Sequence, residues 1–440
     1  MIALEKMLQE TPYVSYTYAY PHKTAYRPFP SLLRLDELWA EEKRSAIFLY
    51  MHVPFCEMRC GFCNLFTTVD TTAKFAAGYL AALERQAERV RAALGEVSIA
   101  RMAIGGGTPT HLAVDDLARL FDLAERLFNV VPGSVPTSVE TSPLTATPAK
   151  LQLLRARGVD RVSIGVQSFI EAESRAAGRA QQTAVVEQAL AAIRTEHFPT
   201  LNIDLIYGLP GQTVANWLTS LQAALRYQPE ELYLYPLYIR PLTGLGRKGV
   251  IDSEDMRLAC YRAGRDLLLA SGYTQVSMRM FRAAHAPVET GPVYCVQDDG
   301  MVGLGCGARS YTRTHHYASE YAVGAQGVRA ILAEYIAMPA KAFDFAYYGF
   351  CLNDEEQRRR YALKSLLEAG GLHLASYQLR FESDVFSDLP ELRALLDAEM
   401  ATLTENVMIL TAAGIERSDT IGPWLYSTRV KELMRGYELR

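Results

Sequence analysis

The sequence lacks the features of membrane, secreted and nucleic-acid-binding proteins. No uncharged run reaches membrane-spanning length, and the N-terminal residues MIALEKMLQETPY lack the apolar core of a signal peptide. No basic block stands out, and the net charge of −4 arises from both signs mixed along the chain. We therefore expect a cytoplasmic protein that binds neither nucleic acid nor a membrane.

Cysteines are few and odd in number, which argues against a disulfide framework. The chain has seven among 440 residues, and this length predicts two or three domains that need no covalent crosslinks. Four cysteines are scattered and are expected to be small buried side chains, namely Cys260, Cys295, Cys306 and Cys351. The other three lie close together, and this clustering is the first functional clue.

Alternating strand-like and helix-like segments predict an α/β core. Apolar, β-rich runs occur at 46–53, 98–104, 135–140, 160–166, 201–206 and 231–238. Segments with helical spacing lie between them at 72–93, 114–128, 146–157, 182–196 and 213–227. Such alternation implies parallel strands joined by right-handed crossovers. We therefore predict a partial (β/α)6, TIM-like barrel or an open wound sheet.

The whole chain divides into four segments. Residues 1–45 form an N-terminal segment rich in tyrosine and proline, where Pro21, Pro28 and Pro30 break any helix. The barrel core follows at 46–250. A barrel extension at 251–350 should contain a helix near 253–271 and short strands near 273–281 and 301–311. Residues 351–440 are expected to form a mainly helical cap with a β-wing within 410–430. The mixed charge of the cap favours a lid over a DNA-binding module.

Three cysteines have the spacing of an iron–sulfur ligand loop. They are Cys56, Cys60 and Cys63 in LYMHVPFCEMRCGFCNLFT, where Gly61 helps the loop to curl. Thiolates bind iron well because they are soft and lose their protons on coordination. A structural cubane normally has four ligands, so three leave one iron open to the amine and carboxylate of a molecule such as S-adenosylmethionine. Zinc is the alternative, but zinc sites usually pair two Cys or Cys/His clusters, and the nearest histidine, His52, precedes the loop.

The loop and four further segments resemble the radical S-adenosylmethionine (SAM) superfamily. The similarity extends to the branch of oxygen-independent coproporphyrinogen III oxidase through LYMHVPFC, IGGGTPTHL, VSIGVQSF, NIDLIYGLPGQT and GLGCGARSY. The resemblance implies a (β/α)6 barrel with a [4Fe–4S] cluster and one SAM molecule, or two side by side. It also implies a winged-helix-like C-terminal cap, a flavodoxin- or ferredoxin-type electron donor and a small-molecule, tetrapyrrole-like substrate. We expect a monomer.

The same resemblance implies the residues that contact SAM. By their positions in or next to the motifs they are Tyr50, Phe62, Gly106, Gly107, Thr108, Glu140, Gln167, Arg179, Asp204 and Arg309, with Cys56, Cys60 and Cys63 on the cluster. No catalytic residue beyond the cluster is assigned. The residue types agree with these roles, because glycines after a strand expose backbone amides, and a carboxylate at the carboxyl end of a barrel strand faces the ligand side. Plainer alternatives are a turn for the glycines, a core position for Tyr50, and a helix cap or loop for the others.

Two departures from the oxidases leave the substrate open. Leu65 stands where they carry a fourth cysteine, and Arg279 and Met280 stand where they carry an acidic residue followed by histidine. Exchanging an acid for arginine inverts the local charge and suggests a different substrate. Candidate partners for substrate carboxylates are Arg240, Arg279, Arg282 and Arg309, with solvated surface positions as the alternative.

The expected function is oxidative decarboxylation of a porphyrinogen or related tetrapyrrole by way of a 5′-deoxyadenosyl radical. The alternatives among enzymes are a methyltransferase, a cyclopropane-forming enzyme, or an anaerobic haem-modifying enzyme that uses two SAM molecules. A haem chaperone is the alternative outside enzymes, since one sister group keeps the cluster loop yet delivers haem. It would need an axial ligand, for which His285, His315 and His316 are available, although each also fits an ordinary loop histidine.

Overall fold

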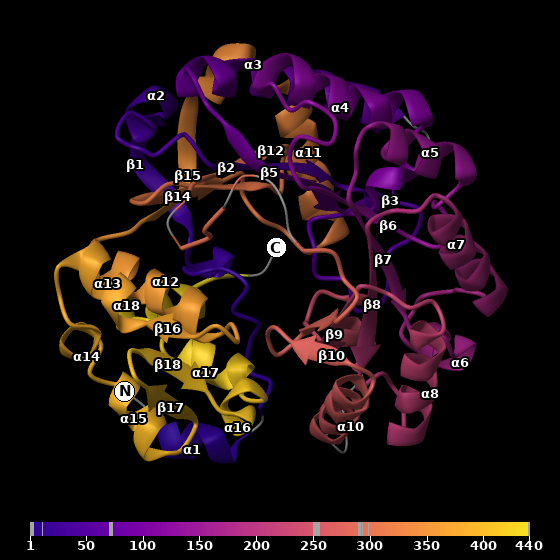
Figure 1. The fold of residues 1–440 in the computed structure, drawn as a ribbon. Helices are drawn as coiled ribbons and strands as arrows, with labels where there is room; N and C mark the ends of the chain where they lie inside the picture. The colour runs from indigo at the N-terminus through magenta and orange to yellow at the C-terminus, as the bar shows by residue number, and fades with distance from the viewer. Residues whose placement is uncertain are drawn as a thin grey trace.

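One large sheet organises the molecule (Figure 1). The computed structural model describes residues 4–10, 12–69, 74–249, 256–288, 292, 294–297 and 299–438. The large sheet has 13 strands in the order β1-β15-β14-β13-β12-β2-β5-β6-β7-β8-β9-β11-β10. A three-stranded sheet, β16-β18-β17, lies in the C-terminal part. The fold is therefore mixed α/β with a helical C-terminal part, which confirms the predicted fold class.

Six parallel strands in chain order form the centre of the large sheet. They are β2 (Ile47–Val53), β5 (Ile99–Gly106), β6 (Thr137–Thr141), β7 (Arg161–Gln167), β8 (Thr200–Tyr207) and β9 (Glu231–Pro236). The helices between them are α3 (Lys74–Leu94), α4 (Val114–Phe128), α5 (Pro148–Ala156), α6 (Glu171–Ala176), α7 (Thr183–Thr195) and α8 (Val214–Leu225). These helices cover the outer face of the strands, as expected of an open barrel (Figure 1).

Hydrophobic patterning explains these elements. Strand β8 reads TLNIDLIY and is buried at every position except Asp204, which is half-buried, since helices cover one face and barrel side chains fill the other. Helix α4 buries Leu117, Leu120 and Phe121 at helical spacing. It ends where Asn129 takes the left-handed conformation, with a φ of 55°.

Shorter strands widen the sheet on both sides. Next to β9 lie β11 (Met280–Ala283) and β10 (Tyr273–Gln275), both antiparallel. Next to β2 lie, in order, β12 (Met301–Leu304), which is parallel to β2, then β13 (Arg309–Tyr311), β14 (His315–Ala318), β15 (Phe345–Cys351) and β1 (Arg27–Arg34). The remaining helical elements of this part are η2 (Pro109–His111), α9 (Gly244–Arg247), α10 (Arg257–Ala270), α11 (Ala325–Ala337) and η3 (Ala340–Asp344).

Parts of three predictions lie outside the described residues. These are the start of the helix predicted at 72–93, the start of the helix predicted at 253–271, and the boundary between 250 and 251. The division into four segments stays a prediction.

The N-terminal segment runs from the C-terminal part to the far edge of the sheet (indigo in Figure 1). It contains α1 (Leu4–Gln9), η1 (Lys23–Ala25), β1 and α2 (Leu35–Leu38). No α-helix includes Pro21, Pro28 or Pro30, as predicted, but the sequence analysis missed β1. Pro28 and Pro30 fit there because β1 is an edge strand, which tolerates residues without an N–H group.

The C-terminal part is mostly helical. Its elements are α12 (Asp354–Leu366), β16 (Leu372–His373), α13 (Leu374–Phe381), α14 (Val385–Asp388), α15 (Leu392–Asp397), β17 (Ala401–Thr404), β18 (Val407–Leu410), α16 (Ala412–Ile415), α17 (Ser418–Trp424) and α18 (Thr428–Arg435). The β-wing predicted within 410–430 is wrong, because the hairpin is β17–β18 and the later residues are helical. Thr411 and Ser427 start two of these helices by accepting the N–H groups of Gly414 and Val430.

Burial also corrects the expectation for the scattered cysteines. Cys260 and Cys306 are buried, but Cys295 is half-buried and Cys351 is exposed. Cys351 is the last residue of the β15 strand, where the alternation of the strand turns it outward. Within the described part of the chain, no helix combines the length and the apolar character needed to cross a membrane.

Candidate cluster and cofactor site

The three clustered cysteines lie in a loop closed by a short strand pair. Strand β3 (Phe55–Cys56) pairs in parallel with β4 (Thr68–Val69), so the loop returns to its start beside the carboxyl end of β2. The Gly61 N–H donates to the Ala177 carbonyl at 3.1 Å, and the Gly61 carbonyl accepts the Leu245 N–H at 2.8 Å. A Cβ on Gly61 would lie 2.6 Å from the Ala177 oxygen. The cysteine loop is therefore hydrogen-bonded to segments that follow β7 and β9, and only glycine fits at position 61.

Each of the three thiols has a hydrogen-bonding neighbour. The pairs are Cys56 with the Thr108 hydroxyl (3.6 Å), Cys60 with the Arg179 guanidinium (3.3 Å) and Cys63 with the Thr67 hydroxyl (3.7 Å). Sequence reasoning placed Thr108 and Arg179 near SAM and missed Thr67. A threonine four residues after the last cysteine of the loop was the available signal.

Burial favours the protonated form of the Cys56 and Cys60 thiols. It raises the pKa of Cys56 to about 12 and also raises the pKa of Cys60, against which the Arg179 charge acts. Iron binding would replace these protons, because coordinated thiols are deprotonated. In the described residues, no three His, Cys, Asp or Glu side chains converge tightly enough to chelate one ion. A cubane assigns each thiolate to a different iron, so the three thiols fit a cluster without meeting at one point.

The glycine run after β5 makes room for parts of the chain itself. A Cβ on Gly106 would lie 2.4 Å from the His52 ring, and one on Gly107 would lie 2.9 Å from the Cys56 sulfur. The Gly106 N–H donates to a carboxylate oxygen of Glu140 at 3.0 Å. Gly106 and Gly107 therefore connect the cysteine loop to the carboxyl end of β6. We call the space around these two glycines the cradle, and a side chain at either position would fill it.

Tyr50 and His52 form a fixed pair under this cradle. The His52 Nε2 lies 3.0 Å from the Phe66 carbonyl, which only accepts, so Nε2 carries the proton and Nδ1 accepts from the Tyr50 hydroxyl at 3.2 Å. Burial lowers the pKa of His52 to about 4, so the ring is neutral at physiological pH. His52 is thus a positioning residue for the cysteine loop and does not serve as a metal ligand here.

Two carboxyl groups lie on barrel strands, the exposed Glu140 on β6 and the half-buried Asp204 on β8. Desolvation by the surrounding protein raises the pKa of Asp204 to about 7 and also raises the pKa of Glu140. Asp204 accepts from the Asn202 amide at 2.8 Å, while the buried Asn202 Oδ1 has no hydrogen-bond partner. This unsatisfied acceptor beside a carboxyl group fits a ligand that brings its own donors, as the amine and ribose of SAM do.

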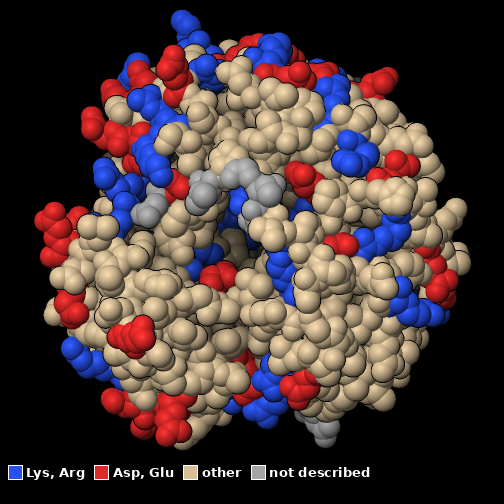
Figure 2. All heavy atoms as spheres, in the orientation of Figure 1, with Lys and Arg blue, Asp and Glu red and all other residues tan. Residues whose placement is uncertain are grey.

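Gln167, Phe62 and Arg309 are further residues for which the sequence predicts contact with SAM. Gln167 ends β7 with a φ of 70°, a conformation that strains a residue with a side chain, and such strain is concentrated at functional sites. Phe62, in the cysteine loop, packs on an apolar cluster that includes Leu209 and Leu245. Arg309 lies on β13 and donates to the Tyr18 hydroxyl at 2.9 Å. Figure 2 shows a hollow at the centre of this face with Lys and Arg atoms inside it.

Two of the four arginines expected to meet substrate carboxylates are already paired. Arg279 forms an ion pair with Asp419 of α17, and both side chains are almost fully buried, at 4% and 1% exposed. Arg282 binds Glu231 at 3.2 Å. Both arginines therefore have an internal carboxylate partner, which Arg282 shares with Arg161, and their contact with a substrate stays a prediction. Met280 lies against the Tyr233 hydroxyl at 3.2 Å.

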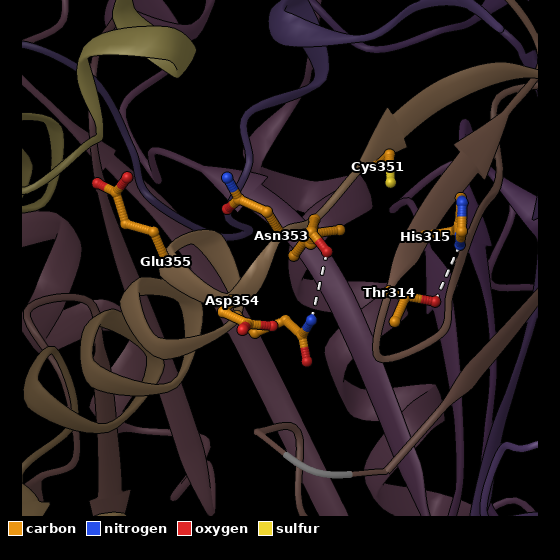
Figure 3. A pocket seen from close by; sticks show the side chains of 8 residues that line it. Thr314, His315, Cys351, Asn353, Asp354 and Glu355 are labelled. Atoms are coloured by element: carbon orange, nitrogen blue, oxygen red, sulfur yellow. Dashed lines mark hydrogen bonds between the residues drawn. The ribbon is translucent and has the colours of Figure 1, made fainter. Parts of the chain in front are cut away.

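The histidines proposed as haem ligands lie elsewhere. His316 is buried against Tyr311, with both ring nitrogens unbonded. His285 is an exposed residue next to the Gln228 carbonyl. His315 faces an open surface hollow of about 590 Å³ between the antiparallel β14–β15 pair and the start of α12. Figure 3 shows this hollow with His315 bonded to Thr314 and with Cys351 on the neighbouring strand. It is remote in the sheet from the cysteine loop, and its acidic lining of Asp354 and Glu355 repels anionic ligands.

Comparison with known proteins agrees with this arrangement. Residues 50–224 match the family model described as the Radical SAM superfamily. The heme chaperone HemW of Bacillus subtilis is 30% identical over 273 residues, which cover 60% of this chain and 72% of HemW. The oxygen-independent coproporphyrinogen III oxidase of Paracoccus denitrificans is 32% identical over 243 residues, 54% of this chain and 53% of that enzyme.

A solved structure shares almost the whole fold. It is coproporphyrinogen III oxidase (HemN) from Escherichia coli, described as a radical SAM enzyme, with a TM-score of 0.79 and 24% identity over 92% of this chain and 96% of HemN. Superfamily members use a [4Fe–4S] cluster together with SAM, and the thiols, amides and carboxyl groups described above suit both. The chain therefore belongs to the radical SAM superfamily, in the branch of the oxygen-independent coproporphyrinogen III oxidases and HemW.

Proposed function

We propose that this protein is a coproporphyrinogen oxidase-like radical SAM oxidoreductase that acts on a propionate side chain of a porphyrinogen or related tetrapyrrole. The observation that carries the proposal is the cysteine loop, whose three thiols stand beside the carboxyl ends of parallel strands next to the Gly106–Glu140 contact. When bound, a cluster at Cys56, Cys60 and Cys63 supplies the electron that splits SAM into methionine and a 5′-deoxyadenosyl radical.

The residues of the chain hold and orient the reactants. Gly106 and Gly107 present backbone to the methionyl end of SAM, and Glu140 and Asp204 accept from its amine and ribose hydroxyls. The N-terminal and C-terminal parts exclude water from the barrel opening. The hydrogen atom taken from the substrate would leave with 5′-deoxyadenosine, and the substrate radical would then release CO₂ and pass one electron to the oxidised form of a one-electron carrier of the flavodoxin or ferredoxin type. The result is a vinyl group in place of the propionate.

Anaerobic reconstitution tests this proposal. The full chain is loaded with iron and sulfide, reduced with dithionite in place of the natural donor, and given SAM and coproporphyrinogen III. We expect about four irons per chain, 5′-deoxyadenosine, and a product that has lost CO₂ and two hydrogen atoms. Cys60→Ala should lose both iron and nucleoside, whereas Cys351→Ala, which changes an exposed cysteine outside the loop, should lose neither.

Haem delivery is the second candidate, because relatives of similar identity are named heme chaperones. That function predicts tight haem binding by the full chain and little cleavage of SAM in the presence of coproporphyrinogen III. Transfer of a methyl or methylene group to the product, seen by its mass, would instead favour an enzyme that uses two SAM molecules.

A further inference from the structure

Three cations from distant segments gather near the cysteine loop, and we call them the mouth cations. Lys23 comes from η1 of the N-terminal segment, Arg240 from the loop after β9, and Arg309 from β13. All three side chains are half-buried. Burial lowers the pKa of Lys23 well below its usual value, and the positive charges of Arg309 and Arg240 lower this pKa further. The two arginines are therefore close enough to Lys23 to act on its charge.

Lys23 is fastened next to the cysteine loop. Its Nζ lies 3.6 Å from the centroid of the Tyr321 ring. The Tyr321 hydroxyl in turn donates to the carbonyl of Asn64, the residue after Cys63. The stabilisation of a cation by a tyrosine ring is much smaller than the cost of removing an ammonium group from water.

The two arginines also rest on aromatic rings. The Arg309 guanidinium lies 4.6 Å from the Tyr18 ring, and the Arg240 guanidinium lies 4.9 Å from the Tyr238 ring. The Arg240 carbonyl accepts the N–H of Thr243, which begins the turn that contacts Gly61 through Leu245. Arg240 is therefore tied to the cysteine loop through backbone contacts.

No acidic residue neutralises the mouth cations. In the described ranges, none of the three has a carboxylate oxygen within 4.0 Å. The Asp419 carboxylate, which accepts from the Tyr238 hydroxyl, is already held by Arg279. Half-buried cations gain from a carboxylate partner, so three of them without one around a single opening point to an anion from outside the chain.

We propose that Lys23, Arg240 and Arg309 bind a carboxylate group of the substrate at the mouth of the barrel, an inference that rests on the proposed function. The arginines are suited to two-point contact with a carboxylate, and Lys23 adds a compact charge on the side of the cysteine loop. For Arg309 this replaces the role of SAM contact expected from sequence. The N-terminal segment thereby becomes part of the substrate site.

Equilibrium binding to the reconstituted full chain tests the proposal. Coproporphyrin III, which carries four carboxylates, is titrated by fluorescence, and tricarballylate, a small tricarboxylate, is titrated by calorimetry. We expect Lys23→Gln and Arg240→Gln each to weaken coproporphyrin binding at least about tenfold, and Lys23→Arg to restore most of it. Arg175→Gln, at an exposed position on α6, is the matched control and should bind as the wild type does. Rising salt should weaken binding more in the wild type than in Lys23→Gln.

Each other outcome has a defined meaning. Equal affinity in all variants would overturn the inference, and so would a parallel loss of iron content or SAM affinity in Lys23→Gln and Arg240→Gln, because the cations would then serve the cofactors. If inorganic phosphate binds and neither carboxylate probe does, the inference also fails. If tricarballylate binds and its binding depends on Lys23, while coproporphyrin III does not bind, the mouth cations bind a carboxylate. The substrate is then not a tetrapyrrole of this kind. Arg240 forms no salt bridge within the described residues, so Arg240→Gln should fold. This variant can therefore test the inference even if Lys23→Gln does not fold.

Discussion

The Arg179 guanidinium lies 3.3 Å from the Cys60 sulfur and at the same time donates to the Gly165 carbonyl at 2.8 Å. One side chain thus links a cluster thiol to the carboxyl end of β7. A charged N–H donor stabilises a sulfur more strongly as its negative charge grows, and hydrogen bonds to cluster sulfurs are among the determinants of cluster potential.

We predict that Arg179→Leu lowers the midpoint potential of the reconstituted cluster. A charge-assisted hydrogen bond of about 1.5 kcal/mol corresponds to roughly 60 mV for one electron. A redox titration followed by electron paramagnetic resonance measures the shift. Arg175→Leu, which removes an exposed arginine from the same helix region, is the control. An unchanged potential in Arg179→Leu would show that the contact has no influence on the cluster.

The strained backbone of Gln167 predicts that replacing this residue by glycine affects the free energy of unfolding and the affinity for SAM differently. Glycine relieves the left-handed conformation, so Gln167→Gly should leave the free energy of unfolding unchanged or raise it by up to about 1 kcal/mol. The same change removes the side chain that is predicted from sequence to contact SAM, so SAM affinity should fall. Urea unfolding and equilibrium dialysis with SAM measure the two effects.

Gln228→Gly provides the matched control for this variant. Gln228 also has a positive φ, of 47°, but it is exposed and lies away from the barrel interior. It should show the same small change in stability with no change in SAM affinity. A fall in the free energy of unfolding by more than 1 kcal/mol in Gln167→Gly alone would mean that the side chain mainly supports the fold.

Asp204 predicts how SAM binding depends on pH. Because burial raises the pKa of Asp204 to about 7, the carboxyl group is ionised above that pH and protonated below it. Protonation removes the negative charge and one acceptor that face the cationic cofactor, so SAM affinity should fall as the pH decreases through 7. Equilibrium dialysis between about pH 6 and pH 8.5 measures it. Asp204→Asn should bind weakly at every pH, and if Glu140→Gln flattens the profile instead, Glu140 is the titrating group.

The buried Arg279–Asp419 ion pair predicts a large asymmetry between single and double variants. Asp419→Asn leaves the Arg279 charge buried without its partner and should lower the free energy of unfolding by about 3–5 kcal/mol. The pair of changes Arg279→Met and Asp419→Leu should recover most of that loss. Glu84→Gln breaks an exposed pair with Arg126 and should cost less than about 1 kcal/mol. Denaturant unfolding of the cluster-free protein measures all three variants.

The barrel was predictable from sequence because its strands carry their signal locally. Strands buried on both faces read as continuous apolar runs, and the helices between them repeat with a separate period. The three cysteines were equally visible, since one short loop holds them all. Strand β1 was hidden because Pro28 and Pro30 suppress the usual strand signal, and the hairpin was placed too late because the turn at Glu405 lacks glycine.

Contacts between residues far apart in the chain could not be predicted from sequence. Nothing near Arg279 in the chain indicates that Asp419, 140 residues later, neutralises it. The same holds for Arg179 and Cys60, which the fold of the segment after β7 brings together. Lys23 lies among aromatic residues in a segment without clear periodicity, and only the folded chain shows that it stands beside the cysteine loop.

The open sheet also has consequences for how the protein behaves when concentrated. A sheet that does not close leaves two edges, and free edges are templates for pairing with other chains. At one edge, Pro28 and Pro30 deprive β1 of two N–H donors, and at the other, β10 is only three residues long. Both edges of the sheet are therefore poor partners for a strand of another chain. The sheet can stay open without a strong tendency to aggregate through its edges.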